Sequence, residues 1–186
     1  MEVVLLDDSP GAGAGLEWLR DLCRRRSFLV EKRTSMVTAA RGIYGSWTGA
    51  QIGRNEMRKW DEEDLEVLLP DPDIRLGVSC LLKPAEAISE QIAAIEAEVL
   101  RSAKLREEFR KLETVWGIGK VLALTIMYEV GDISRFSDVG HFASYCRLVN
   151  TDRRSDAKSK GKGNRKNGNP YLSWAFSEAA YYAERC

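Results

Sequence analysis

The chain has 186 residues, of which 44% are hydrophobic and 30% are charged. This composition excludes wholesale disorder and suits one ordinary folded domain or two small ones. Its 28 basic and 28 acidic residues cancel, so the whole chain carries no net charge. No apolar stretch is long enough to cross a bilayer, and the first residues lack the basic region of a signal peptide. The four cysteines form no CxxC pair, and one histidine is too few to complete a common zinc site. We therefore expect reduced thiols in a cytoplasmic protein.

The N-terminal third is predicted to be helical after a short strand at residues 2–6 and a Gly/Pro-rich linker. Apolar residues recur near helical spacing from Leu16 to Tyr44, and the opposite side of this helix is rich in arginine. That side is either a basic binding surface or an ordinary solvated face. Residues 45–57 are expected to be a polar loop, and residues 61–69 a short acidic helix that the sequence "PDPD" ends.

A long helix is predicted from about Pro84 to Leu112. Its isoleucine and valine residues step by four, three and four, which is the pattern of a coiled-coil seam; they are Ile88, Ile92, Ile95 and Val99. A seam this short also fits a helix that packs on its own domain. The pattern leaves open whether the helix pairs with itself, with a relative, or with the rest of this chain.

The C-terminal part is predicted to be a compact helical domain, with helices after Gly119, over residues 138–148, and from Pro170 to the end. The sequence "WGIGKVLA" fits the turn of a helix-hairpin-helix. Its glycines permit a tight turn, and the free N–H groups of the next helix suit a phosphate, with Lys120 adding a charge. The alternative is a glycine turn, at Gly117 and Gly119, that only lets two helices pack.

Positive charge is concentrated between Arg147 and Gly168, where eight basic and two acidic residues give +6 and leave −6 for the remainder. Such a segment usually contacts a polyanion, although a solvated tail is the alternative. Bases interleaved with glycine and asparagine suit sugar-phosphate contacts. The candidate nucleic-acid-binding residues here are Arg153, Arg154, Lys158, Lys160, Lys162, Arg165 and Lys166.

Ser155 lies within this basic segment, in "RRSDAK". A serine hydroxyl is a weak nucleophile unless a neighbouring group activates it, and no histidine is adjacent. The flanking bases would neutralise a phosphate under attack. Composition alone favours a loop serine or a phosphate contact over a nucleophile, and it makes Ser159 an equal candidate.

The segments "ETVWGIGKVLALTIMYEVGDISRF", "HFASYCRLV" and "SDAKSKGKGNRKNGNPYLSWAFSEAA" resemble, in this order, the C-terminal transposase domain of the one-ten insertion-sequence family. These transposases are guided by a bridge RNA. The resemblance runs from about Glu113 to Ala180, and the 84–112 helix more weakly resembles the family's coiled coil. It implies that Ser155 attacks DNA and forms a covalent phosphoserine link. It also places Lys158, Lys166, Gly168 and Asn169 in the motif that follows the serine.

Relatives in this family begin with an RNase H-like domain whose four acidic residues bind a divalent metal such as magnesium. The residues before position 84 leave no room for such a domain, and relatives usually run on past the position of Cys186. The chain is therefore expected to be truncated at both ends, and the missing acidic domain is expected to impair catalysis. Asp7 or Asp8 superficially resembles a first metal ligand, but the linker follows too soon, and no metal ligand is assigned. The acidic residues at 61–64 are expected to begin a helix.

The sequence therefore predicts a mostly α protein with three parts: a helical region at 1–83, a coiled-coil-like helix at 84–112, and a transposase domain at 113–186. The expected function is DNA transposition and recombination through a serine-phosphate intermediate. The expected partners are DNA, a guide RNA and a second copy of the chain bound through the 84–112 helix. The alternative is a non-catalytic nucleic-acid-binding or dimerisation module.

Overall fold

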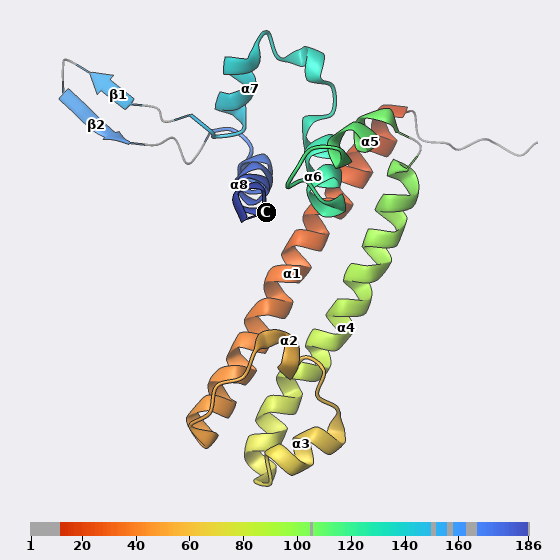
Figure 1. Cartoon of the computed structure of the whole chain (residues 1–186), viewed down its shortest axis with the longest axis vertical. Coiled ribbons are helices and arrows are strands. Elements are labelled where there is room, and N and C mark those ends of the chain that lie inside the picture. The colour runs from red at the N-terminus through yellow and green to blue at the C-terminus, as the bar shows by residue number, and fades with distance from the viewer. Residues whose placement is uncertain (1–11, 105, 150–151, 156–157, 163–166, 186) are drawn as a thin grey trace, which may run out of the picture. The chain divides into compact units, whose positions relative to one another are not determined.

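The computed structural model describes residues 12–104, 106–149, 152–155, 158–162 and 167–185, and it is mostly α, as the sequence predicts (Figure 1). The chain divides into two compact units. One unit comprises residues 24–98, and the other combines residues 1–23 with 99–186. The predicted strand at 2–6, together with Asp7 and Asp8, lies outside the described residues.

The unit of residues 24–98 contains most of α1 (Ala12–Thr48), then α2 (Arg54–Met57), α3 (Glu62–Leu68) and most of α4 (Pro72–Ala103). The helix predicted from Leu16 is confirmed. The bounds predicted for the long helix, 84–112, are wrong at both ends. Helix α4 begins at Pro72, runs through Pro84 and ends at Ala103, and a separate short helix follows it. The carboxylate of Asp71 accepts hydrogen bonds from the amides of Asp73 and Ile74 and so caps α4. The "PDPD" sequence thus also begins a helix.

Helices α1 and α4 lie antiparallel within this unit (Figure 1). Arg26 contacts Glu96 at 2.6 Å and Arg33 contacts Ser89 at 3.4 Å, so residue numbers rise along one helix as they fall along the other. Val78, Ala85 and Ile92 are buried at seven-residue spacing on α4. The apolar stripe is therefore covered within the chain. The homo-oligomer predicted through this helix stays a prediction.

The core of this unit lies where α1, α2, α3 and α4 meet. Met57, Leu69 and Val78 are fully buried there, and the rings of Tyr44 and Trp60 pack edge to face at 5.1 Å. The acidic residues at 61–64 begin α3, as predicted, and Asp61 and Asp64 form a reciprocal capping box. They are accounted for as a helix start.

The second unit is built around α6 (Lys120–Val130), which is buried from Leu122 to Val130. It packs between α5 (Glu107–Glu113) and α8 (Pro170–Arg185). A 3-10 helix η1 (Ile133–Arg135) leads to α7 (Val139–Tyr145). Aromatic rings join these elements, with Phe142 packed edge to face on Phe136 at 5.2 Å and on Phe176 at 5.9 Å.

The basic segment between α7 and α8 contains strands, which its sequence pattern does not predict. Two strands, β1 (Asp152–Ser155) and β2 (Lys158–Lys162), form an antiparallel two-stranded sheet (Figure 1). Within the described part of the chain, no helix combines the length and the apolar character needed to cross a bilayer.

Candidate nucleic-acid interface

The turn before α6 packs against α8 through Gly117. Its φ is +85°, a left-handed conformation that favours glycine. A Cβ at this position would lie 2.3 Å from the carbonyl oxygen of Ala179 and 3.0 Å from the amide nitrogen of Ala183. This close approach accounts for a glycine at this position by packing alone. A nucleic-acid contact by Gly117 stays a prediction.

Gly119 has a different environment. It is the N-cap of α6, has an extended conformation and forms no side-chain capping bond. A Cβ at this position would meet no atom within 4 Å. Lys120 and Trp116 beside it are exposed. The amides of the first turn of α6 therefore begin the helix without a side-chain cap. A phosphate contact by Gly119 and Lys120 stays a prediction.

The hairpin brings most of the other predicted site residues into one small sheet. Ser155 pairs with Lys158 and Arg154 pairs with Ser159. The 155–158 pair is the last one before residues 156–157, so Ser155 occupies the end of its strand nearest the connection. The sheet also carries the backbones of Arg153, Lys160 and Lys162. Arg165 and Lys166 lie outside the described residues.

The chain entering the hairpin is tied to the chain leaving it. Arg147, at φ +58°, donates from Nε to the carbonyl oxygen of Asn167 at 2.8 Å and from Nη2 to that of Gly168 at 3.1 Å. Gly168 has φ +85°, and a Cβ there would lie 2.5 Å from the carbonyl oxygen of Tyr145. Arg147, counted in the sequence as one more basic residue, is thus a structural clamp.

Asn169 fixes the other side of this clamp. Its Nδ2 donates to Oε2 of Glu129 at 2.6 Å, and its Oδ1 accepts from the amides of Tyr171 and Leu172. The backbone amide of Asn169 also donates to the carbonyl oxygen of Tyr145 at 2.7 Å. Asn169 and Glu129 are both buried, with 4% and 3% exposure. One side chain therefore caps α8 and joins it to α6.

The single histidine lies at the start of α7 beside an aspartate and a serine. Nδ1 of His141 lies 2.7 Å from Asp138 and 2.9 Å from Ser137. A catalytic triad needs the aspartate and serine on opposite ring nitrogens, whereas both contact the same nitrogen here. Asp138 accepts a hydrogen bond from the backbone amide of His141, and this bond is the largest cause of the lowered pKa of Asp138. The group is a helix cap.

A metal centre is not found in the described part of the chain. No cluster of three or more His, Cys, Asp or Glu side chains among the described residues is arranged to hold an ion. These residues therefore do not fit the divalent metal that the family resemblance implies.

Comparison with known proteins shows what the chain is similar to. Residues 109–186 match the family described as "Transposase IS116/IS110/IS902 family". The chain is 27% identical over 155 residues to the transposase for insertion sequence element IS1111A of Coxiella burnetii (strain RSA 493 / Nine Mile phase I). That match covers 81% of this chain and 42% of the relative, so the chain spans less than half of the relative's length. No solved structure matches.

Proposed function

Because residues 109–186 match the IS116/IS110/IS902 transposase family, we propose that the chain binds DNA through its basic hairpin and takes part in transposition. Ser155 is the proposed nucleophile. The observation that carries the proposal is the pairing of Ser155 with Lys158 at the end of a basic two-stranded sheet, inside the matched segment.

The proposed chemistry is a transesterification. The serine oxygen forms a bond to phosphorus while one P–O bond to a deoxyribose oxygen breaks. The proton of the serine hydroxyl is taken up by a base, and the released sugar oxygen gains a proton. The phosphodiester is exchanged for a phosphoserine ester, which a second DNA hydroxyl can attack. The bases of β1 and β2 supply positive charge beside the phosphate. No step of the proposal uses a metal ion.

The clamp supports this role because it sets the position of both ends of the basic segment. Arg147 and Asn169 hold the residues before and after the hairpin, Arg147 through an exposed contact and Asn169 through a buried one. A reacting serine must be held close to its productive geometry, which a segment tethered at one end only would not provide. DNA and a guide RNA are the proposed partners of this surface.

A covalent trapping experiment tests the proposal. Nicked duplexes taken from the DNA that flanks the reading frame are incubated with the full chain, and protein–DNA adducts are separated under denaturing conditions. We expect adducts with the wild type and with Ser159→Ala, but none with Ser155→Ala. Adducts that persist in Ser155→Ala would refute the assignment of the nucleophile.

A second candidate function is a non-catalytic nucleic-acid-binding module. It is favoured by the high density of basic residues on β1 and β2, which suits phosphate contacts whether or not Ser155 reacts. In this case no adduct forms with any variant, and Ser155→Ala binds DNA like the wild type. Replacing Lys158, Lys160 and Lys162 together would still weaken binding.

A further inference from the structure

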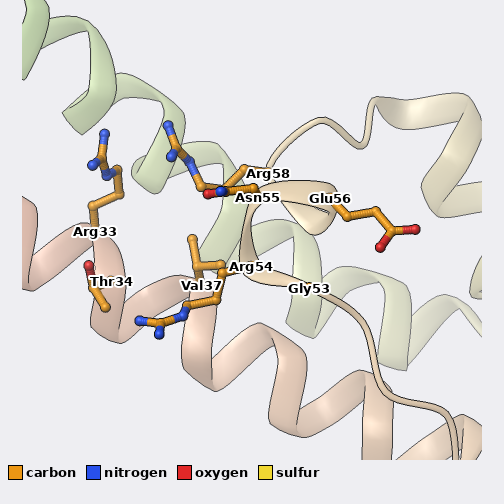
Figure 2. A pocket seen from close by; sticks show the side chains of 8 residues that line it. All are labelled: Arg33, Thr34, Val37, Gly53, Arg54, Asn55, Glu56 and Arg58. Atoms are coloured by element: carbon orange, nitrogen blue, oxygen red, sulfur yellow. The ribbon is translucent and has the colours of Figure 1, made fainter. Parts of the chain in front are cut away.

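The unit of residues 24–98 contains a basic pocket that the proposed function does not use. The pocket has a volume of about 570 Å³ and lies between α1 and the segment that carries α2. Arg33, Arg54 and Arg58 line it, together with the polar side chains of Thr34 and Asn55 (Figure 2). Three arginine residues thus line one open pocket.

Acidic side chains occur near the three arginines, and Glu86 and Glu90 line a second pocket beside Arg58. Among the residues that the structure describes, no acidic side chain forms an ion pair with Arg33, Arg54 or Arg58. The one acidic residue of the lining, Glu56, points away from the three arginines in Figure 2. Glu96, whose charge raises the pKa of Arg33, is paired with Arg26 at 2.6 Å.

The electrostatic environment of Arg33 shows the effect of this crowding. Burial lowers its pKa, and the positive charges of Arg58 and Arg26 lower it further, while Glu96 acts in the opposite direction. Like charges gathered around a partly desolvated group destabilise one another. An anion in the pocket would relieve that repulsion, so the arrangement favours binding of negative charge.

We propose that this pocket binds a backbone phosphate of a nucleic acid. Arginine forks match phosphate oxygens in a bidentate geometry, and hydroxyl and amide side chains such as those of Thr34 and Asn55 are common additional donors to phosphates. The volume exceeds what a single phosphate needs and accommodates the flanking sugars as well. Arg54 and Arg58 are exposed, so the pocket is open to a continuous polymer.

This inference does not depend on chemistry at Ser155. It places a nucleic-acid contact in residues 24–98, outside the segment 109–186 that matches the transposase family. The proposed function fails if no covalent adduct forms. The pocket is tested by nucleic-acid binding alone, so its failure is distinguishable from the failure of chemistry at Ser155.

The test measures fluorescence anisotropy of labelled duplex DNA and labelled RNA of equal length, titrated with the full chain at several salt concentrations. The variants are Arg54→Gln, Arg58→Gln and the double variant. We expect each to weaken binding about tenfold, the size of one charged hydrogen-bonded contact. The slope of log Kobs against log salt should fall by about 0.9 per lost contact on duplex DNA.

Two controls separate a phosphate contact from a general loss of charge. Lys59→Gln removes one charge next to Arg58 but outside the lining of this pocket, and its effect should be clearly smaller. Arg54→Lys and Arg58→Lys keep the charge but lose the fork geometry, so they should restore binding only in part. Thermal melts of each variant check that the unit stays folded.

The proposal is overturned if the double variant binds nucleic acid as tightly as Lys59→Gln does. It is also overturned if inorganic phosphate or polyglutamate binds the wild type in an Arg54- and Arg58-dependent manner while the nucleic acids do not. The first outcome would show that the arginines make no contact, and the second that the pocket takes a free anion or an acidic peptide. Loss of both DNA and RNA binding supports a shared backbone contact.

Discussion

At the scale of single residues, the two glycines of the turn before α6 occupy different environments. Gly117 combines a positive φ with an approach to the backbone of α8, whereas Gly119 faces open space. We expect Gly117→Ala to lower the free energy of unfolding by about 1–3 kcal/mol, because backbone atoms of α8 cannot move as a flexible side chain would. Gly119→Ala should cost less than about 1 kcal/mol. Urea denaturation of both variants checks this, and equal losses would contradict it.

The thiol of Cys146 gives a pH-dependent prediction. Cys146 is fully buried, and burial raises its pKa to about 11. The folded protein keeps the neutral thiol at a pH where the unfolded chain ionises it. The free energy of unfolding should therefore be undiminished below the ordinary thiol pKa and fall by about 2–3 kcal/mol as pH rises from about 8.5 to 11.

The measurement compares unfolding of the wild type and Cys146→Ala across this pH range, since all other titrating groups are common to both. The difference between the two proteins should shrink as pH rises. A constant difference would show that the thiol ionises equally in the folded and unfolded states. Reaction with a thiol reagent at neutral pH gives a second check, because Cys80 is exposed and should react much faster than Cys146.

At the scale of elements, Asn169 connects the start of α8 to α6. Asn169→Ala removes both the cap of α8 and an amide donor to Glu129, so we expect a loss of about 2–4 kcal/mol in the free energy of unfolding. Asn167→Ala is the matched control. Asn167 is exposed and contributes its carbonyl oxygen to Arg147, which alanine retains, so its effect should stay within about 0.5 kcal/mol. Equal losses would exclude the capping role.

The helices could largely be predicted from the sequence because their determinants are local. Apolar periodicity predicted α1, and the run of acidic residues at 61–64 predicted the start of α3. The true start of α4 was also available locally, because Asp71 followed by Pro72 is a common N-cap and first-turn pair. Pro84 is an equally plausible first-turn residue by sequence, but it lies in the interior of α4.

The hairpin and its clamp could not be predicted in the same way. Strand signals depend on alternating apolar and β-branched residues, and β1 and β2 contain lysine, arginine, serine and glycine instead. The clamp depends on two separate contacts, from Arg147 to the carbonyl oxygen of Asn167 and from Asn169 to Glu129. The partners in each contact are far apart in the chain and come together only on folding. Ser155 was selected by family resemblance, and its pairing with Lys158 is information that only the backbone provides.

At the scale of the whole molecule, the zero net charge conceals two concentrations of positive charge. One is the basic segment from Arg147 to Gly168, and the other is the arginine pocket of the unit 24–98. They lie in different units, so each can be altered without touching the residues of the other. Non-specific affinity for nucleic acid should therefore follow the location of the charges removed and not the net charge of the chain.

The salt dependence of DNA binding shows whether affinity follows the location of the charges or the net charge of the chain. Substituting Gln at Lys158, Lys160 and Lys162 should reduce the slope of log Kobs against log salt on duplex DNA by up to about 2.7, because each lost phosphate contact contributes about 0.9. The control triple, Gln at Lys83, Lys104 and Lys111, changes the net charge equally. Lys83 and Lys111 are already paired with Glu62 and Glu107, so the control slope should stay near that of the wild type. If both triples reduce the slope to the same extent, overall charge governs binding and the hairpin makes no specific contact. If only the hairpin triple reduces the slope, β1 and β2 contact DNA phosphates. Those strands also carry Ser155, so the phosphates lie where Ser155 would have to reach them.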